Sequence, residues 1–270
     1  MSTDTGSTYA IAQGEQGASR LEVLTRLTWS SSARFLQKQG CLDGMHCLEL
    51  GCGAGAVSQV LLALLGDKGR LTGFDIDSES IALAKKNVNE PAANFTVMDL
   101  EKDSLPSEPV YDLIYCRLIL EHLSDPMAVI SRLNKQLKPG GVFVVQDADC
   151  HDFLHWPENA AYQQYAKLLT ALIKKQGGCP QLGRQLPSIF RRSGFTDINF
   201  EVEHPIYVEG EGKQFPIMTL EAIREGLLKE KLLSEKEYSV LLDKLSQFCS
   251  DPDSLVGIVR FVHCAGRKPC

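Results

Sequence analysis

Between residues 45 and 150 the sequence alternates short apolar runs with amphipathic stretches, and this alternation limits the possible folds more than any other feature. The spacing predicts strands over 45–50, 69–76, 93–100, 111–116 and 142–148, helices over 56–65, 78–89 and 126–137, and a turn at 138–141. Strands that alternate with helices across short turns form a parallel sheet covered by helices on both faces. We therefore expect an α/β, doubly wound fold.

The segments before residue 45 and after residue 150 differ from this part in their predicted secondary structure. Helices are expected over 16–39, 152–176 and 183–195 and between 218 and 248, and strands over 196–208 and 255–267. The chain is accordingly expected to divide into an N-terminal arm and helix (1–40), an α/β core (41–150), helical cap insertions (151–180 and 209–250), and segments that complete the core (181–208 and 251–270).

Composition and charge make several classes of partner unfavourable. The chain has 270 residues, 34 acidic against 28 basic, which does not favour binding to nucleic acid or to an anionic membrane. No run of 18 apolar residues predicts a transmembrane helix, and the first 16 residues lack the pattern of a signal peptide. The nine cysteines include no C-x-x-C pair, so they are expected to be buried, reduced thiols in a cytoplasmic protein.

The stretch "LELGCGAGAVS" (48–58) places a glycine loop between the first predicted strand and helix. Gly51, Gly53 and Ala56 satisfy the G-x-G-x-x-G/A pattern of dinucleotide-binding proteins, and Asp75 closes the next strand, where it can bind ribose hydroxyls. A nicotinamide nucleotide is therefore one candidate ligand.

Further features point to a different ligand. Glu49 precedes the loop, where a carboxylate suits a cationic amino group better than a pyrophosphate. Gly55 extends the loop to G-x-G-x-G, which suits a ligand lying across it. The later motifs "GFDID", "VMDLE", "YDLIYCRLILEHLSDP" and "LNKQLKPGGVFVVQD" follow in order.

With these motifs, the chain resembles the class I S-adenosylmethionine-dependent methyltransferases, in particular their small-molecule branch of ubiquinone and menaquinone biosynthesis. The resemblance covers about 45–150 and extends to about 198 through "GRQLPSIFRRSGFTDI". It implies a Rossmann-like methyltransferase fold, with a seven-stranded, mostly parallel sheet whose last strand is antiparallel. It also implies S-adenosylmethionine as cofactor and a small molecule as methyl acceptor.

The resemblance assigns expected roles residue by residue. Gly51 and Gly53 would contact the methionine portion through their backbone, and Glu49 would orient the loop or its amino group. Asp75 would bind both ribose hydroxyls. The remaining expected contacts are Ile76 on the adenine face, Asp99 and the Leu100 backbone at the adenine amine, and Cys116 and Arg117 on the methionine and sulfonium side.

Several of these residues also have purely structural interpretations. Asp75 and Asp99 follow strands, where aspartate often forms turns or caps helices. Cys116 has no evident partner for its thiol, so its backbone would matter more than its side chain. Arg117 can equally be a solvated helix-start residue, a salt-bridge former or a ligand contact.

The segment before the first strand folds over the cofactor in related enzymes. Tyr9, Gln13 and Arg20 are the candidates in this chain to close on the methionine end. The alternative is a flexible terminus without a role in binding.

Methyl transfer needs alignment of the acceptor and exclusion of water, while a general base is optional. His122, after the fourth strand, is the candidate base, although a histidine there can simply be packed or act as a cap. The other candidates near strand ends are Asp147, Asp149, His151 and His155. His151 and His155 would share a helix face, but no third ligand accompanies them, so no metal is expected.

Aromatic residues are frequent in the cap segments, namely Phe153, Trp156, Tyr162, Tyr165, Tyr207, Phe215 and, beside them, Met218. They suit an apolar acceptor or simply pack the cap. The sequence thus favours an S-adenosylmethionine-dependent methyltransferase that acts on a small molecule by direct displacement. An NAD(P)-dependent oxidoreductase and a methyltransferase-like regulatory protein without turnover remain alternatives.

Overall fold

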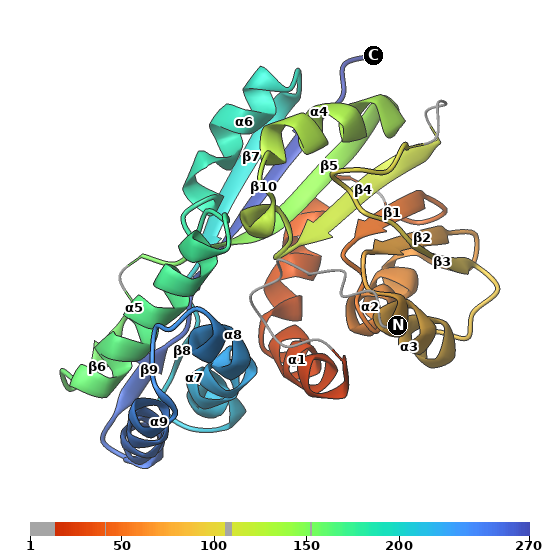
Figure 1. Cartoon of the computed structure of the whole chain (residues 1–270). Coiled ribbons are helices and arrows are strands. Elements are labelled where there is room, and N and C mark those ends of the chain that lie inside the picture. Colours follow the sequence, from red (N-terminus) through yellow and green to blue (C-terminus); the bar gives the residue numbers. More distant parts are fainter. Residues whose placement is uncertain (1–13, 41, 106–109, 152) are drawn as a thin grey trace.

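A seven-stranded sheet forms the centre of the computed structural model, which describes residues 14–40, 42–105, 110–151 and 153–270 (Figure 1). Its strands, in spatial order, are β3 (Ala93–Val97), β2 (Arg70–Asp75), β1 (His46–Leu50), β4 (Tyr111–Arg117), β5 (Leu137–Asp149), β10 (Arg260–Arg267) and β7 (Thr196–Glu203). The pairs among β1 to β5 are parallel, whereas β10 is antiparallel to both of its neighbours. The predicted doubly wound sheet with an antiparallel last strand is confirmed.

Helices cover both faces of this sheet, because successive residues of each buried strand point to opposite sides. On one face, Ile114 and Cys116 of β4 share a core with α4 (Pro126–Gln136) and α6 (Leu186–Arg192). On the other face, Leu113 and Tyr115 pack with α1 (Gly14–Lys38), α2 (Ala56–Leu65) and α3 (Ser78–Asn87). Asp77 caps α3 by accepting from the Glu79 and Ser80 N–H groups.

A second group of elements lies beside the sheet, at the lower left of Figure 1. It contains α5 (Ala160–Lys175), α7 (Glu211–Ala222), α8 (Arg224–Lys229), α9 (Glu235–Ser250) and a small sheet in the order β6 (His155–Trp156), β9 (Leu255–Gly257) and β8 (Ile206–Tyr207). These elements have their own apolar core. The first half of α1 joins the two groups, because Leu24 packs against Phe215 of α7.

The expected turn at 138–141 is wrong, because β5 already begins at Leu137. The Gly140 N–H donates to the Lys268 carbonyl, and the Lys268 N–H donates to the Gly141 carbonyl. The positive φ of Gly140, 75°, lets the chain bulge without leaving the sheet. Hydrogen bonds to a residue remote in the sequence therefore make this segment part of β5.

Two other expected elements are interrupted by proline. The helix expected from 152 begins only at Ala160, since Pro157 disfavours helical backbone before it, and Asn159 caps α5. His155 and Trp156 instead pair with β9. The strand expected over 196–208 is broken at Pro205, so β7 lies in the large sheet and β8 in the small one.

The expectation of buried cysteines is only partly correct. The eight cysteines that the structure describes are free thiols, of which Cys270 is exposed and Cys179 is half-buried. None of the helices in the described part of the chain has both the length and the apolar character needed to cross a bilayer.

Candidate functional site

The main cavity, of about 940 Å³, lies where the carboxyl ends of β1, β2 and β4 meet. Parallel strands of open α/β sheets present their ligand sites at this edge. The loop after β3 and one face of α1 complete the wall. The cavity has the size of a nucleoside-cofactor site.

Most of the residues singled out from the sequence line this cavity, namely Glu49, Gly51, Gly53, Asp75, Ile76, Asp99, Leu100, Arg117 and His122. Cys116 does not, because its side chain is completely buried in the core under α4 and α6. Burial also raises the pKa of the Cys116 thiol, which keeps it neutral. Tyr9 and Gln13 lie outside the described residues.

The glycine loop is held in a conformation that side chains would not tolerate. Gly51 and Gly53 have φ angles of 65° and 52°, in the left-handed region. A Cβ atom on Gly51 would lie 2.1 Å from Cδ1 of Ile119 in the segment after β4. The two glycines therefore bring the loop backbone to the cavity wall.

Asp75 binds this loop directly. Its Oδ2 accepts a hydrogen bond from the Gly53 N–H at 2.8 Å, and its Oδ1 accepts from the Asp77 N–H at 2.9 Å. Burial raises the pKa of Asp75, although these two N–H donors oppose the shift. A loop N–H that could face a phosphate is thus already occupied by a carboxylate.

Glu49 forms part of the cavity wall although its side chain is almost fully buried. The Ser58 hydroxyl donates to its Oε2 at 2.5 Å. Burial raises the pKa of Glu49 to about 8, while the hydrogen bond from Ser58 and the charge of Arg117 act in the opposite direction. Glu49 is therefore mostly protonated near neutral pH, and a cationic group placed beside it would favour its ionised form.

The side chain of Arg117 binds α1 at the wall of the main cavity. Its guanidinium is buried and donates to the Thr25 and Thr28 hydroxyls, each at 3.0 Å. Arg117 is therefore not the solvated helix-start residue that the sequence allowed. We call the part of the wall formed by Glu49 and Arg117 the inner end of the cavity; Ser58 lies behind it as the hydrogen-bond partner of Glu49.

The outer end of the cavity, which we define as Ile76, Asp99 and Lys102, is open to solvent. Ile76 is 51% exposed although it is apolar. Asp99 accepts from the Glu101 N–H at 2.9 Å, and its Oδ2 lies 2.8 Å from Nζ of Lys102. Burial acts to raise the pKa of Asp99, but the hydrogen bonds from Lys102 and Glu101 outweigh it and the pKa is lowered. Asp99 is therefore a stable carboxylate.

His122 is the one candidate base that reaches the main cavity. Its Nε2 lies 3.5 Å from Oε1 of Glu121, and its side chain is 8% exposed. Burial, followed by the positive charge of Arg20, lowers the pKa of His122 to about 4. The imidazole is neutral at physiological pH and can accept a hydrogen bond.

The other candidate bases lie elsewhere. Asp147 is buried beneath the site, where it accepts from the Glu121 N–H at 3.1 Å, and burial raises its pKa to about 7. Asp149 pairs with Arg184 through both carboxylate oxygens. His151 and His155 line a separate cavity and do not share a helix face. Within the described ranges, no group of three His, Cys, Asp or Glu side chains is arranged to hold a metal ion.

Sequence reasoning expected the segment before the first strand to cover the cofactor, but it did not name the residues of α1 that line the cavity, nor the residue after α5. Glu22, Thr25 and Arg26 of α1 line the cavity, as does Gln176 directly after α5. Their helical spacing of three and four residues on α1 was a usable signal, since it places them on one face. Arg20, expected to close on the methionine end, instead donates to the Thr219 hydroxyl of α7 at 3.2 Å.

The aromatic residues of the cap segments do not reach the main cavity. Tyr162, Tyr165 and Phe215 are buried in cores, whereas Trp156 is 66% exposed. Phe153 and Tyr162 line the separate cavity between α5 and the chain after β5. The buried aromatic residues therefore pack the cores of the protein and do not line the main cavity.

The strand order, the glycine loop and the acidic residues at successive strand ends define a Rossmann-like nucleoside-binding class of protein. A family model described as a methyltransferase domain matches residues 42–202. The chain belongs to this methyltransferase-domain family.

Individual relatives agree with this assignment. A ubiquinone biosynthesis O-methyltransferase of Cronobacter sakazakii is 29% identical over 107 residues, which are 39% of this chain and 43% of that protein. The match thus spans less than half of the curated relative.

Two solved structures show the same fold. One is an S-adenosylmethionine-dependent methyltransferase from Mesorhizobium loti (TM-score 0.54, 17% identity, 90% of this chain and 98% of that one). The other is phosphoethanolamine N-methyltransferase 2 of Haemonchus contortus in complex with S-adenosyl-L-methionine (TM-score 0.55, 17% identity, 94% of this chain and 53% of that one).

Proposed function

We propose that this protein transfers a methyl group from S-adenosylmethionine to a small-molecule acceptor. The observation that carries the proposal is the pair of carboxyl groups beside the glycine loop, of which Glu49 would ionise when a cation binds next to it. Asp75 occupies the Gly53 N–H, and Glu49 stands in the wall beside it. A pyrophosphate would meet two carboxyl groups there, whereas a ligand with an ammonium group would be attracted by them.

Successive parts of the cavity wall would bind successive parts of this cofactor, from its methionine end to its adenine. Glu49, with the backbone of Gly51 and Gly53, would receive the methionine end. Asp75 would bind the ribose hydroxyls, since each of its oxygens retains a lone pair after accepting one backbone N–H.

At the outer end, the exposed Ile76 side chain would cover a face of the adenine. Asp99, an ionised acceptor, would bind the adenine amine, with the Leu100 backbone beside it. Arg117 would act mainly by keeping α1 closed over the inner end.

When bound, S-adenosylmethionine supplies an electrophilic methyl group on a sulfonium. The chain has to orient an acceptor atom and exclude water. Helix α1, held by Arg117, covers the inner end and serves the second need. His122 lies in the wall as a neutral imidazole and would accept a hydrogen bond from an acceptor hydroxyl. The name of the O-methyltransferase relative supports a hydroxyl as acceptor.

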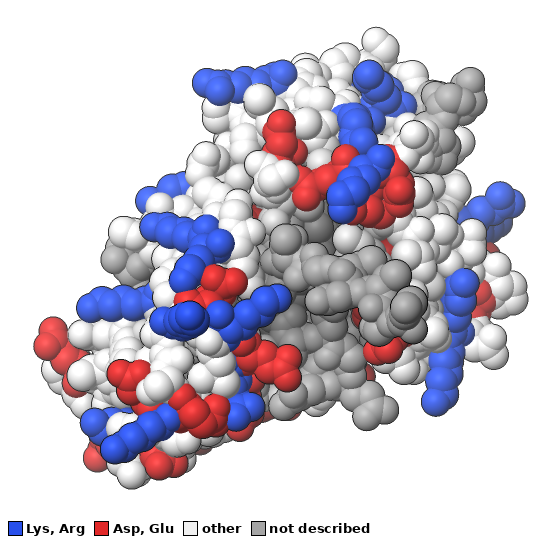
Figure 2. All heavy atoms as spheres, in the orientation of Figure 1, with Lys and Arg blue, Asp and Glu red and all other residues white. Residues whose placement is uncertain are grey.

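The domain organisation that fits this function has residues 41–150 as the cofactor-binding core and 181–208 and 251–270 as its completion. Residues 1–40 would cover the cofactor, and 151–180 and 209–250 would form the cap. On the face shown in Figure 2, acidic and basic side chains of the described residues are interspersed, which suits a small-molecule acceptor rather than nucleic acid. The free thiols suit a cytoplasmic protein.

The test is an acceptor screen with S-adenosylmethionine that carries a labelled methyl group. Phenols, amines and thiols are each incubated with the protein, and labelled products are detected by mass spectrometry. We expect methylated product with a hydroxyl-bearing acceptor and at least a tenfold loss of rate in Asp75→Ala. Lys236→Ala, a charge change on the exposed surface of α9, should retain the wild-type rate. Cofactor-dependent hydride transfer without methylated product would contradict the proposal.

A further inference from the structure

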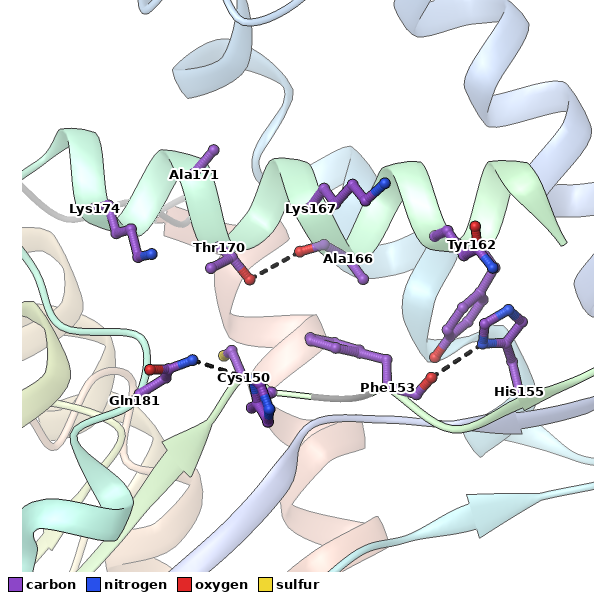
Figure 3. A pocket seen from close by; sticks show the side chains of 12 residues that line it. Cys150, Phe153, His155, Tyr162, Ala166, Lys167, Thr170, Ala171, Lys174 and Gln181 are labelled. Carbon is purple, nitrogen blue, oxygen red and sulfur yellow. Dashed lines mark hydrogen bonds between the residues drawn. The ribbon is translucent and has the colours of Figure 1, made fainter. Parts of the chain in front are cut away.

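A second cavity, of about 490 Å³, lies between α5 and the chain that follows β5 (Figure 3). One wall is the face of α5 that carries Lys167, Thr170 and Lys174, and the opposite wall contains Cys150 and Phe153. No described residue lines both this cavity and the main one. We call this second cavity the α5 slot.

Two lysines provide the charge of the α5 slot. Lys167 and Lys174 are seven residues apart, which places them on the same face of the helix and about 10 Å apart along its axis. Among the described residues, neither ammonium group takes part in an ion pair or hydrogen bond. No aspartate or glutamate is found among the lining residues that the structure describes.

The lack of ion pairs at Lys167 and Lys174 distinguishes them from several other lysines of this acidic chain. Lys38, Lys102 and Lys138 each have a carboxylate within 2.8 Å, in a protein that carries 34 acidic and 28 basic residues. An unpaired lysine on a solvated helix face is common, but these two border a cavity with a second wall opposite them. Both lysines are exposed to solvent, and their positive charge borders an open cavity rather than a flat helix face.

The other end of the α5 slot is apolar and flat. The rings of His155 and Tyr162 stack with their centroids 4.7 Å apart, and Phe153 meets Tyr165 edge to face at 6.2 Å. The thiol of Cys150 lies in the opposite wall, and burial raises its pKa, so it remains neutral. Rigid aromatic surface beside a cationic edge binds ligands that combine a planar apolar body with a negative charge.

We propose that the α5 slot is a second ligand site, which binds a small amphipathic anion with a carboxylate on a flat apolar body. The carboxylate pairs with Lys167 and Lys174, and Gln181 on the opposite wall offers a further amide donor. The apolar body lies against Phe153 and Tyr162. Because the lining residues are distinct from those of the main cavity, this ligand does not compete with a ligand bound at the glycine loop.

The experiment is calorimetric titration of the full-length protein with three compounds, 2-naphthoate, its neutral amide 2-naphthamide, and acetate. We expect 2-naphthoate to bind at least tenfold more tightly than either of the other two. Saturating S-adenosylhomocysteine should leave its dissociation constant unchanged. Equal affinity for the amide, displacement by S-adenosylhomocysteine, or no binding of naphthoate at millimolar concentrations would overturn the proposal.

Amino-acid substitutions test whether naphthoate binds in the α5 slot. Lys167→Ala/Lys174→Ala should weaken naphthoate binding at least tenfold, whereas Lys236→Ala/Lys244→Ala, which removes the same charge from exposed positions on α9, should leave it unchanged. Thr170→Trp keeps both lysines and fills the volume between them, so it should abolish binding. Wild-type affinity in the lysine pair variant or in Thr170→Trp would refute the site. Circular dichroism checks that each variant is folded.

Discussion

The two ends of the main cavity use the same kind of residue to opposite effect. At the inner end, Glu49 is buried and its pKa is raised to about 8. At the outer end, Asp99 binds Lys102 and a backbone N–H, and its pKa is lowered. The difference teaches that the position of an acid in the fold decides its chemistry: the inner carboxyl responds to the charge of a ligand, and the outer one offers a fixed acceptor.

The largest expected effect comes from removing the inner guanidinium. Arg117→Ala leaves the Thr25 and Thr28 hydroxyls and the buried Glu49 without their charged partner. We expect the free energy of unfolding to fall by about 3 kcal/mol, because hydrogen bonds to charged groups contribute about 1.5–3 kcal/mol each. Urea denaturation measures this change.

Lys102→Ala is the matched variant at the outer end. Lys102 is 81% exposed, so its ion pair with Asp99 adds little to the folded state. Its unfolding midpoint should equal that of the wild type. If the two variants were equally destabilised, the contrast between the two ends would be wrong.

The second effect concerns binding. Asp75→Ala removes a carboxylate that both holds the Gly53 N–H and is proposed to bind ribose. We expect S-adenosylhomocysteine to bind more weakly by about 1–3 kcal/mol through the loss of charge-assisted hydrogen bonds. In Asp99→Ala the loss should be smaller, since that acid is already engaged by Lys102. An unchanged dissociation constant in Asp75→Ala would refute the ribose assignment.

The third effect is a pH dependence at the inner end. Glu49 has a pKa of about 8 in the folded chain against an ordinary value of 4.5, so between these values the folded protein retains a proton that the unfolded chain has lost. Its contribution to stability is therefore present at low pH and is lost as the pH rises through 8. We expect wild-type stability to fall from about pH 5 to about pH 8, by up to about 1.4 kcal/mol per pH unit.

Glu49→Gln removes this titration and should flatten the decline, as urea denaturation across the same range would show. Burial also raises the pKa values of Asp147 and Glu121, so part of the decline will remain in the variant. Equal slopes for variant and wild type would mean that Glu49 does not carry the proton.

The fold was largely predictable because it depends on local patterns. The apolar runs and the glycine loop are encoded within a few residues, whereas the seven-stranded sheet with its antiparallel last strand was expected from the family resemblance. The strand at Leu137 to Gly141 was missed because its partners, such as Lys268, are remote in the sequence. The break at Pro205 was also missed, together with the transfer of β8 to a second sheet.

The sequence identified most residues of the site, but it did not show which of them are buried or protonated. Neighbours on one strand point to opposite sides, so the sequence could not decide between Cys116 and Arg117 as wall residues, and only Arg117 lines the cavity. The raised pKa of Glu49 depends on its burial, which the sequence pattern did not show. His151 and His155 were placed on one helix because the effect of Pro157 was overlooked.

Calorimetric titration of the protein with S-adenosylhomocysteine and, separately, with NAD⁺ tests the central claim most directly. The Asp75 carboxylate on the Gly53 N–H, and Glu49, whose ionised form a cation would favour, should admit the ligand with an ammonium group and reject the one with a pyrophosphate. We predict saturable binding of S-adenosylhomocysteine and no heat of binding with NAD⁺. Saturable binding of NAD⁺, with none of S-adenosylhomocysteine, would contradict the account.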